Sequence, residues 1–168
     1  MFGLARTLAL PGVGFETVSG TRPCRDCRQR TLTGGRQSMC AQNYDPGYLS
    51  YFECFNRQCF FEAHEVLEAL WLPQRQGPNG LFYKGLIQLA GAFVHLQKNR
   101  LGPAAALFAL AQSNLQKYPA TYEGLEVVSV LAMIEDWLRK SKSAEPATNP
   151  FTPADAPRVH LQSPGPRH

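Results

Sequence analysis

The feature that most constrains the fold is a segment from about residue 80 to 99 that is apolar on nearly every side. At about 100° per residue, its apolar side chains leave no wide polar face. A helix of this kind in a globular protein is buried all round, so other helices must surround it. Its apolar residues are Leu81, Phe82, Leu86, Ile87, Leu89, Ala90, Phe93, Val94 and Leu96.

Amphipathic segments flank this central helix on both sides. We expect helices over about 46–56, 59–72, 102–118 and 121–141. Asp45-Pro46 is typical of a helix start, and we place the start of the last helix at Thr121. Because the loops are short, successive helices should be antiparallel neighbours. The sequence therefore predicts an all-α fold: residues 44–142 form a compact bundle of about five helices, with no strand.

The two ends of the chain differ from this domain in composition. Residues 1–43 have neither helical nor strand periodicity and are rich in arginine, so we expect a disordered basic arm, and a start at Met39 would leave most of it out of the product. Residues 143–168 are rich in proline, and we expect a disordered tail that packs little.

Charge and hydropathy exclude two classes of partner. The net charge of +4 comes from the arm, because residues 39–141 hold nine acidic and eight basic side chains. A nearly neutral domain does not favour nucleic-acid binding. The longest uncharged apolar stretch, residues 85–96, is shorter than the ~20 residues that span a bilayer. We therefore expect neither a nucleic-acid nor a membrane partner.

Cysteine usage points to a reducing compartment. Five cysteines without a secretory signal favour free thiols and a cytoplasmic protein. Cys24 and Cys27 have the spacing of half a zinc site, which by itself is a weak signal.

Two polar strips on neighbouring helices are the candidate functional residues. At helical spacing, residues of the first strip share one side of the helix over 59–72, and those of the second share one side of the central helix. Polar groups on a buried helix need partners, because an unpaired one costs ~1–3 kcal/mol. The first strip is His64, Glu65 and Glu68 with Trp71 beside it, and the second is Lys84, Gln88 and His95.

Three interpretations of the strips stay open. The first is a buried structural seam, in which Glu68 pairs with Lys84 and Gln88 bonds to His64 or Glu65. The second is a pocket for a small ligand or a protein partner. The third is a divalent metal site with His64, Glu65 and Glu68 as ligands and His95 as a distant fourth, with which the domain would be a metal-dependent, hydrolase-like enzyme.

Other chemistries are excluded by the residues present. Glu68 stands where the HExxH zinc motif needs its second histidine, so a metalloprotease of that type is ruled out. The sequence has neither a nucleophile placed beside a histidine nor a glycine-rich phosphate loop. A helical-repeat interaction domain is a further alternative, but the chain has no internal period.

Two stretches carry a family resemblance: Phe61-Glu-Ala-His-Glu-Val-Leu-Glu-Ala-Leu-Trp71 and Tyr83-Lys-Gly-Leu-Ile-Gln-Leu-Ala-Gly-Ala-Phe-Val-His95. Over about residues 48–138 the chain resembles the domain of unknown function number 309, a family of small helical proteins of bacteria and archaea. The resemblance implies an all-helical bundle whose His-Glu-Glu strip faces the Gln-His helix, and it implies no activity. Where the family usually has a glycine before the first motif, this chain has Asn56-Arg57-Gln58, so we expect a tighter or more helical turn there.

The function that we predict is a binding module that uses the polar pocket between the helices over 59–72 and 80–99. Its partner would be a small ligand or a protein, with no certain cofactor. An antiparallel pair of helices would place Glu68 opposite Lys84 or Gly85, and His64 opposite Gln88 or Leu89.

Overall fold

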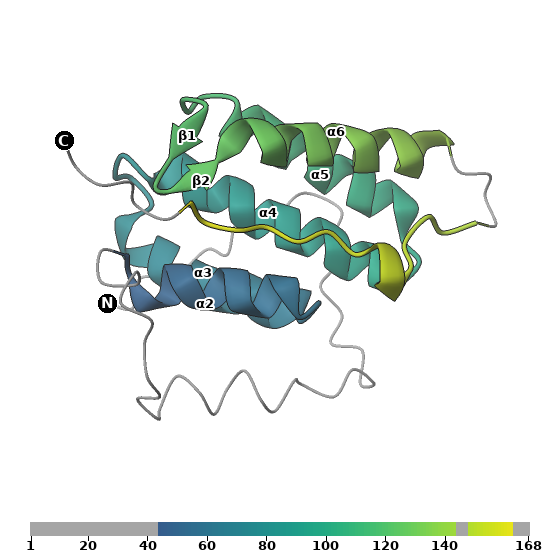
Figure 1. Cartoon of the computed structure of the whole chain (residues 1–168), viewed down its shortest axis with the longest axis horizontal. Coiled ribbons are helices and arrows are strands. Elements are labelled where there is room, and N and C mark those ends of the chain that lie inside the picture. Colours follow the sequence, from purple (N-terminus) through teal and green to yellow (C-terminus); the bar gives the residue numbers. More distant parts are fainter. Residues whose placement is uncertain (1–43, 144–147, 163–168) are drawn as a thin grey trace, which may run out of the picture.

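The computed structural model of the chain describes residues 44–143 and 148–162, and our expectations for residues 1–43, including Cys24 and Cys27, lie outside them. Among these described residues, five α-helices make up most of the domain (Figure 1). The all-α bundle is therefore confirmed. The helices are α2 (Pro46–Asn56), α3 (Phe60–Trp71), α4 (Gly80–Gln97), α5 (Leu101–Leu115) and α6 (Val127–Ser143).

Helix α4 lies at the centre of the bundle, as its composition predicts. Thirteen of its eighteen residues are buried, and it packs against both α3 and α5. Phe93 stacks on Phe60 with ring centroids 4.9 Å apart, and the edges of Phe55, Phe108 and Trp137 surround it. Among the described residues, no helix combines the length and the apolar character that crossing a membrane requires.

The signals at the start of the bundle act as expected, but the turn after α2 does not. The Asp45 side chain accepts a 2.7 Å hydrogen bond from the Gly47 N–H, and Pro46 is the first helical residue. The turn before α3 is neither tighter nor more helical, because Gln58 adopts a left-handed conformation with φ of 63°. Glutamine thus occupies a backbone conformation that glycine adopts without strain.

The start predicted for the last helix at Thr121 is wrong. Residues Thr121–Tyr122 (β1) and Leu125–Glu126 (β2) form a short antiparallel hairpin, and α6 begins only at Val127. Glu123 and Gly124 make its two-residue turn with φ of 48° and 70°, which an α-helix cannot contain. The Tyr48 hydroxyl donates a 3.0 Å hydrogen bond to the Glu123 carbonyl and so helps to hold this strained residue.

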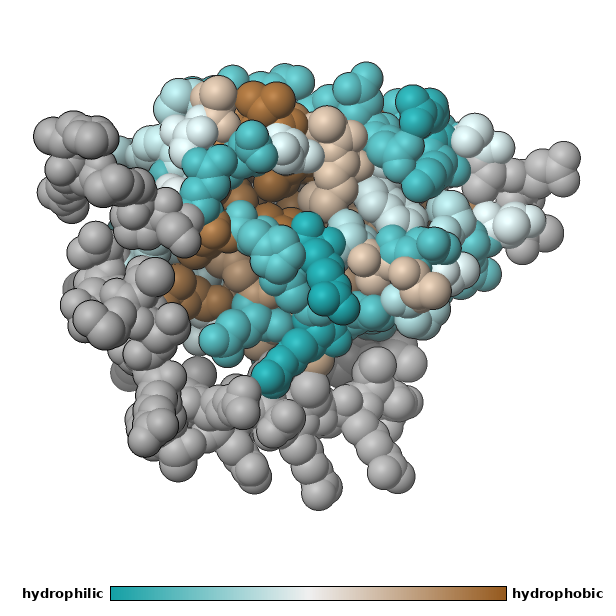
Figure 2. Space-filling model, in the orientation of Figure 1, coloured by the Kyte–Doolittle hydropathy of each residue, from teal (hydrophilic) through white to brown (hydrophobic). Residues whose placement is uncertain are grey.

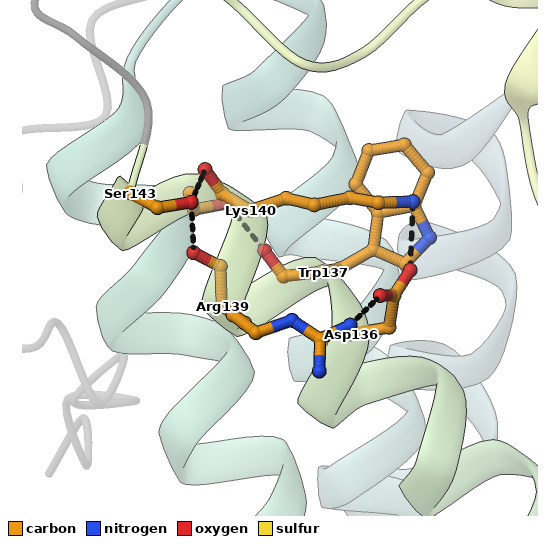
Figure 3. A network of polar contacts seen from close by, with 6 residues as sticks. Asp136, Trp137, Arg139, Lys140 and Ser143 are labelled. Carbon is orange, nitrogen blue, oxygen red and sulfur yellow. Dashed lines mark hydrogen bonds and ion pairs between the residues drawn. The ribbon is translucent and has the colours of Figure 1, made fainter.

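The end of α6 carries a surface ion-pair network over a buried tryptophan (Figure 3). Lys140 Nζ lies 2.7 Å from Asp136 Oδ2 and 4.8 Å from the centroid of the Trp137 ring, and Arg139 also contacts Asp136. The hydrogen bond from Lys140 holds the pKa of Asp136 below its usual value. Trp137 itself is buried against Phe93.

The prediction that the tail packs little is wrong for residues 148–162, which we call the C-terminal segment. It runs lengthwise across α4, between α6 and α2 (Figure 1). Val159 is buried, Phe151 packs against the core, and Leu161 pairs with Leu125 of β2. The composition of the segment could not predict this packing, because the side chains that hold the segment in place belong to the helices and not to the segment itself. Its 3-10 turn, Pro153–Asp155, is capped by Thr152.

Candidate functional site

The two predicted strips lie on α3 and α4, where these helices pack against each other. Gly91 marks the place where α5 joins them: a Cβ built on Gly91 would lie 3.3 Å from Leu107 Cδ1 of α5 and 3.9 Å from His64 Cδ2 of α3. Gly91 is half-buried, like Lys84 and Gln88 on the same helix. We call the meeting point of His64, Gly91 and Leu107 the Gly91 junction. His64 thus lies opposite Gly91, two to three residues beyond the predicted Gln88 or Leu89.

His64 and Glu68 are neighbours on α3. Their Nδ1 and Oε2 atoms lie 3.8 Å apart, with side chains 23% and 39% exposed. This distance is too long for a hydrogen bond. Burial lowers the pKa of His64, and the carboxylates of Glu68 and Glu65 oppose that shift. Glu65 is exposed, so it lies at the edge of the strip and not inside it.

The polar residues predicted on α4 do not share one set of partners. Gln88 accepts a 2.8 Å hydrogen bond from Asn114 of α5, and the hydrogen bonds found among the described residues include none from Gln88 to His64 or Glu65. Lys84 is half-buried, and the ion pairs found in the described part of the chain do not join it to Glu68. An ion pair between Glu68 and Lys84 is therefore not what holds α3 to α4.

Trp71 and His95 lie at opposite ends of the strips. The Trp71 indole donates a 2.8 Å hydrogen bond to the Gly80 carbonyl and so ties the end of α3 to the start of α4. His95 is eleven residues beyond Lys84, about 16 Å along the helix, so both cannot contact one small ligand. His95 is buried, and its Nδ1 has no hydrogen-bond partner within 44–143 and 148–162. Burial, aided by Arg100 and Lys98, lowers its pKa.

The geometry lends no support to the metal interpretation. Within the part of the chain that the structure describes, no three His, Cys, Asp or Glu side chains come together as ligands of one ion. A divalent metal on His64, Glu65 and Glu68 stays a prediction.

The comparisons with known proteins concern the same helices. The model of a family described as "Domain of unknown function (DUF309)" matches residues 48–107. The predicted resemblance to that family is thus confirmed over residues 48–107. The DUF309 region runs from α2 into α5 and contains all seven predicted strip residues. It ends at residue 107, whereas the resemblance found in the sequence extends to about residue 138. No curated protein and no solved structure matches the chain.

Sequence reasoning missed several residues that complete the site. In the DUF309 region these are Gly91 and Leu107, and beyond it Asn114, the polar residue that meets Gln88. A glycine within an apolar helix was the available signal, because it marks a close approach of backbone or ligand. A second polar cluster was also missed: Asn79 bonds Tyr122, Tyr83 and Glu123 beside the hairpin.

The two histidines predict a loss of stability in mild acid. Both have pKa values below the ~6.5 of an unfolded chain, so the unfolded state binds more protons near and below that pH. The free energy of unfolding should therefore be at its full value above pH 7.5 and fall as the pH drops to 5.5. Urea titrations at both pH values measure this change. His64→Gln and His95→Gln should each remove part of it, and an unchanged slope in both variants would contradict the assignment.

Proposed function

We propose that the domain is a binding module whose small polar ligand lies over the Gly91 junction. The observation that carries the proposal is Gly91 itself. It has no side chain at the point where Leu107 and His64 approach, 3.3 and 3.9 Å from a Cβ built there, on a side of α4 where Lys84 and Gln88 are also only half-buried. Small ligands bind where a few polar groups converge beside apolar walls, and this junction has both.

The polar groups around the junction suggest the chemistry of the ligand. The bond between Asn114 and Gln88 uses one amide donor and one carbonyl. Their other groups, the Gln88 amide nitrogen and the Asn114 carbonyl, make no further hydrogen bond with described residues, so both can serve a ligand. Lys84 supplies a positive charge, and Glu68 a negative one on the facing helix. This combination suits a molecule that carries both charges, such as an amino acid.

Thermal melts with a panel of amino acids, amino-acid amides, small carboxylates and amines test the proposal. A ligand at 100 times its dissociation constant adds about 2.7 kcal/mol, which raises the Tm of a domain of this size by about 10 °C. Gly91→Val should abolish that increase, because its methyl groups would fill the junction. Ala109→Val places a valine at an exposed position of α5 and should leave the increase intact.

Two outcomes would count against this function. If no compound of the panel raises the Tm of the wild-type chain, the junction does not bind this class of ligand. If zinc, manganese or magnesium raises the Tm instead, and Glu68→Ala removes that effect, the metal-dependent alternative with His64, Glu65 and Glu68 gains support.

A further inference from the structure

The C-terminal segment is bound to the helices in the way that a peptide ligand is bound to a receptor. Two of its side chains are anchors. Phe151 packs with ring centroids 6.0 Å from Phe60, 6.0 Å from Trp137 and 6.1 Å from Phe93. Val159, eight residues later, is only 5% exposed. The segment thus fills two separate apolar sites along one face of the bundle.

Between and beyond these anchors, the helices bind the main chain of the segment. Asn56, the last residue of α2, donates a 2.8 Å hydrogen bond from Nδ2 to the Val159 carbonyl and accepts one of 2.8 Å from the Val159 N–H. One side chain therefore satisfies both main-chain groups of a buried residue, as a neighbouring β-strand would. Gln58 donates a further 2.8 Å hydrogen bond to the Pro153 carbonyl.

At the hairpin the segment adds to the sheet edge. Leu161 forms an antiparallel bridge with Leu125, and the Gln162 N–H donates a 2.7 Å hydrogen bond to the Gly124 carbonyl. Addition of an extended strand to a free edge is a common mode of peptide recognition, in which main-chain bonds give affinity and side-chain pockets give specificity. The most apolar residues on this face of the molecule gather toward the hairpin end (Figure 2).

The composition of the segment suits a ligand that can leave. Its outward side chains are exposed and polar: Thr152, Asp155, Arg158 and His160. Pro150, Pro153 and Pro157 limit its conformations, which lowers the entropy that binding costs. Several residues that receive it, including Asn56, Phe60 and Phe93, lie in the DUF309 region, whereas the segment lies outside that region. Part of the receiving surface thus lies in the DUF309 region, whereas Trp137 and the hairpin, which also receive the segment, lie beyond residue 107.

We infer that this surface is a peptide-binding groove, that the C-terminal segment occupies it as an internal ligand, and that the same segment of a second copy binds there when the internal one is displaced. The groove selects an aromatic residue followed by an aliphatic one eight positions later. The contacts of Asn56 and the hairpin edge then hold the main chain of whichever copy supplies the segment.

A labelled synthetic peptide of residues 148–162 tests the inference by fluorescence anisotropy. The receptor is the full-length chain with Phe151→Ser and Val159→Ser, which removes both internal anchors. It should bind the peptide, and it should not bind a peptide that carries the same two serines. The wild-type chain should bind at least about tenfold more weakly, because its tethered segment competes at an effective concentration near millimolar.

A matched pair of further substitutions in the receptor distinguishes recognition of the peptide main chain from non-specific apolar binding. Asn56→Ala should weaken peptide binding by about 10- to 100-fold, because two hydrogen bonds to a buried residue are lost. Gln58→Ala removes one exposed hydrogen bond to the same peptide and should weaken binding by less than about threefold.

The result that overturns the inference is a receptor that is folded by circular dichroism and binds neither peptide. If the double-serine receptor does not fold, a protease site inserted between Ser143 and Thr148 of the wild-type chain gives the answer. After cleavage, exchange of the released segment for labelled peptide supports the groove. Failure of the cleaved chain to exchange, or its unfolding, shows that the segment is an integral part of the fold.

Discussion

Replacing Phe93 by alanine should lower the free energy of unfolding by about 3–5 kcal/mol, because it removes a fully buried ring from the centre of the core. Four other aromatic rings, two of them Phe60 and Trp137, have centroids within 5.5 Å of it. These four rings come from the four other helices, so no single helix can move to close the cavity. Since domains of this size have only about 5–15 kcal/mol of stability, the variant should be close to unfolding at 37 °C.

Urea denaturation followed by circular dichroism measures this loss. Phe61→Ala is the matched control, since Phe61 is the same residue type on α3 but is 40% exposed. Its substitution should cost less than about 1.5 kcal/mol, because much of the ring is already in water. Equal losses in the two variants would mean that Phe93 is not at the centre of the core.

The second large effect is expected at Gly85, where α4 and α5 approach closely. A Cβ at this position would lie 2.8 Å from Leu115 Cγ and 3.4 Å from the Ala111 carbonyl oxygen, and Leu115 is fully buried. Gly85→Val should therefore destabilise the domain by about 3 kcal/mol, because the two helices must move apart. Gly91→Val, the same change on the same helix, should cost less than about 1 kcal/mol, since its nearest neighbour is the end of the half-buried Leu107 side chain.

A double-mutant cycle identifies the cause of that loss. Leu115→Ala alone should cost about 2–5 kcal/mol through the cavity that it leaves. Combined with Gly85→Val, it should cost about 1–3 kcal/mol less than the sum of the two single changes, because the valine fills that cavity. Strict additivity in chemical denaturation would show that the two residues do not touch.

The parts of the fold that sequence predicted are those that depend on local signals. Helix α4 follows from its own apolar residues, and α2 begins at Pro46 because Asp45 caps it. The hairpin and the C-terminal segment depend on contacts with distant residues. Tyr48 supports the strained turn at Glu123 from 75 positions away, and Asn56 binds Val159 from 103 positions away. Neither periodicity nor composition contains such information.

The candidate site was predicted only as a list of residues on two faces. Helical spacing placed His64 and Glu68 together and brought α3 against α4. It could not show that Gln88 bonds to Asn114, because α5 is a third helix whose rotation depends on packing. The expected pair of Glu68 and Lys84 rested on opposite charge, and Coulomb attraction between half-exposed side chains is too weak to determine their positions.

The order of the helices along the chain also bears on how quickly the protein folds. Each α-helix packs chiefly against the one before it and the one after it: α2 with α3, α3 with α4, α4 with α5, and α5 with α6. Contacts between sequence neighbours close only short loops, and chains dominated by such contacts fold within microseconds to milliseconds. The bundle can thus assemble progressively from its N-terminal helices, as they emerge during synthesis. Docking of residues 148–162 closes the longest loop and belongs to the last step, after the surface that receives it has formed.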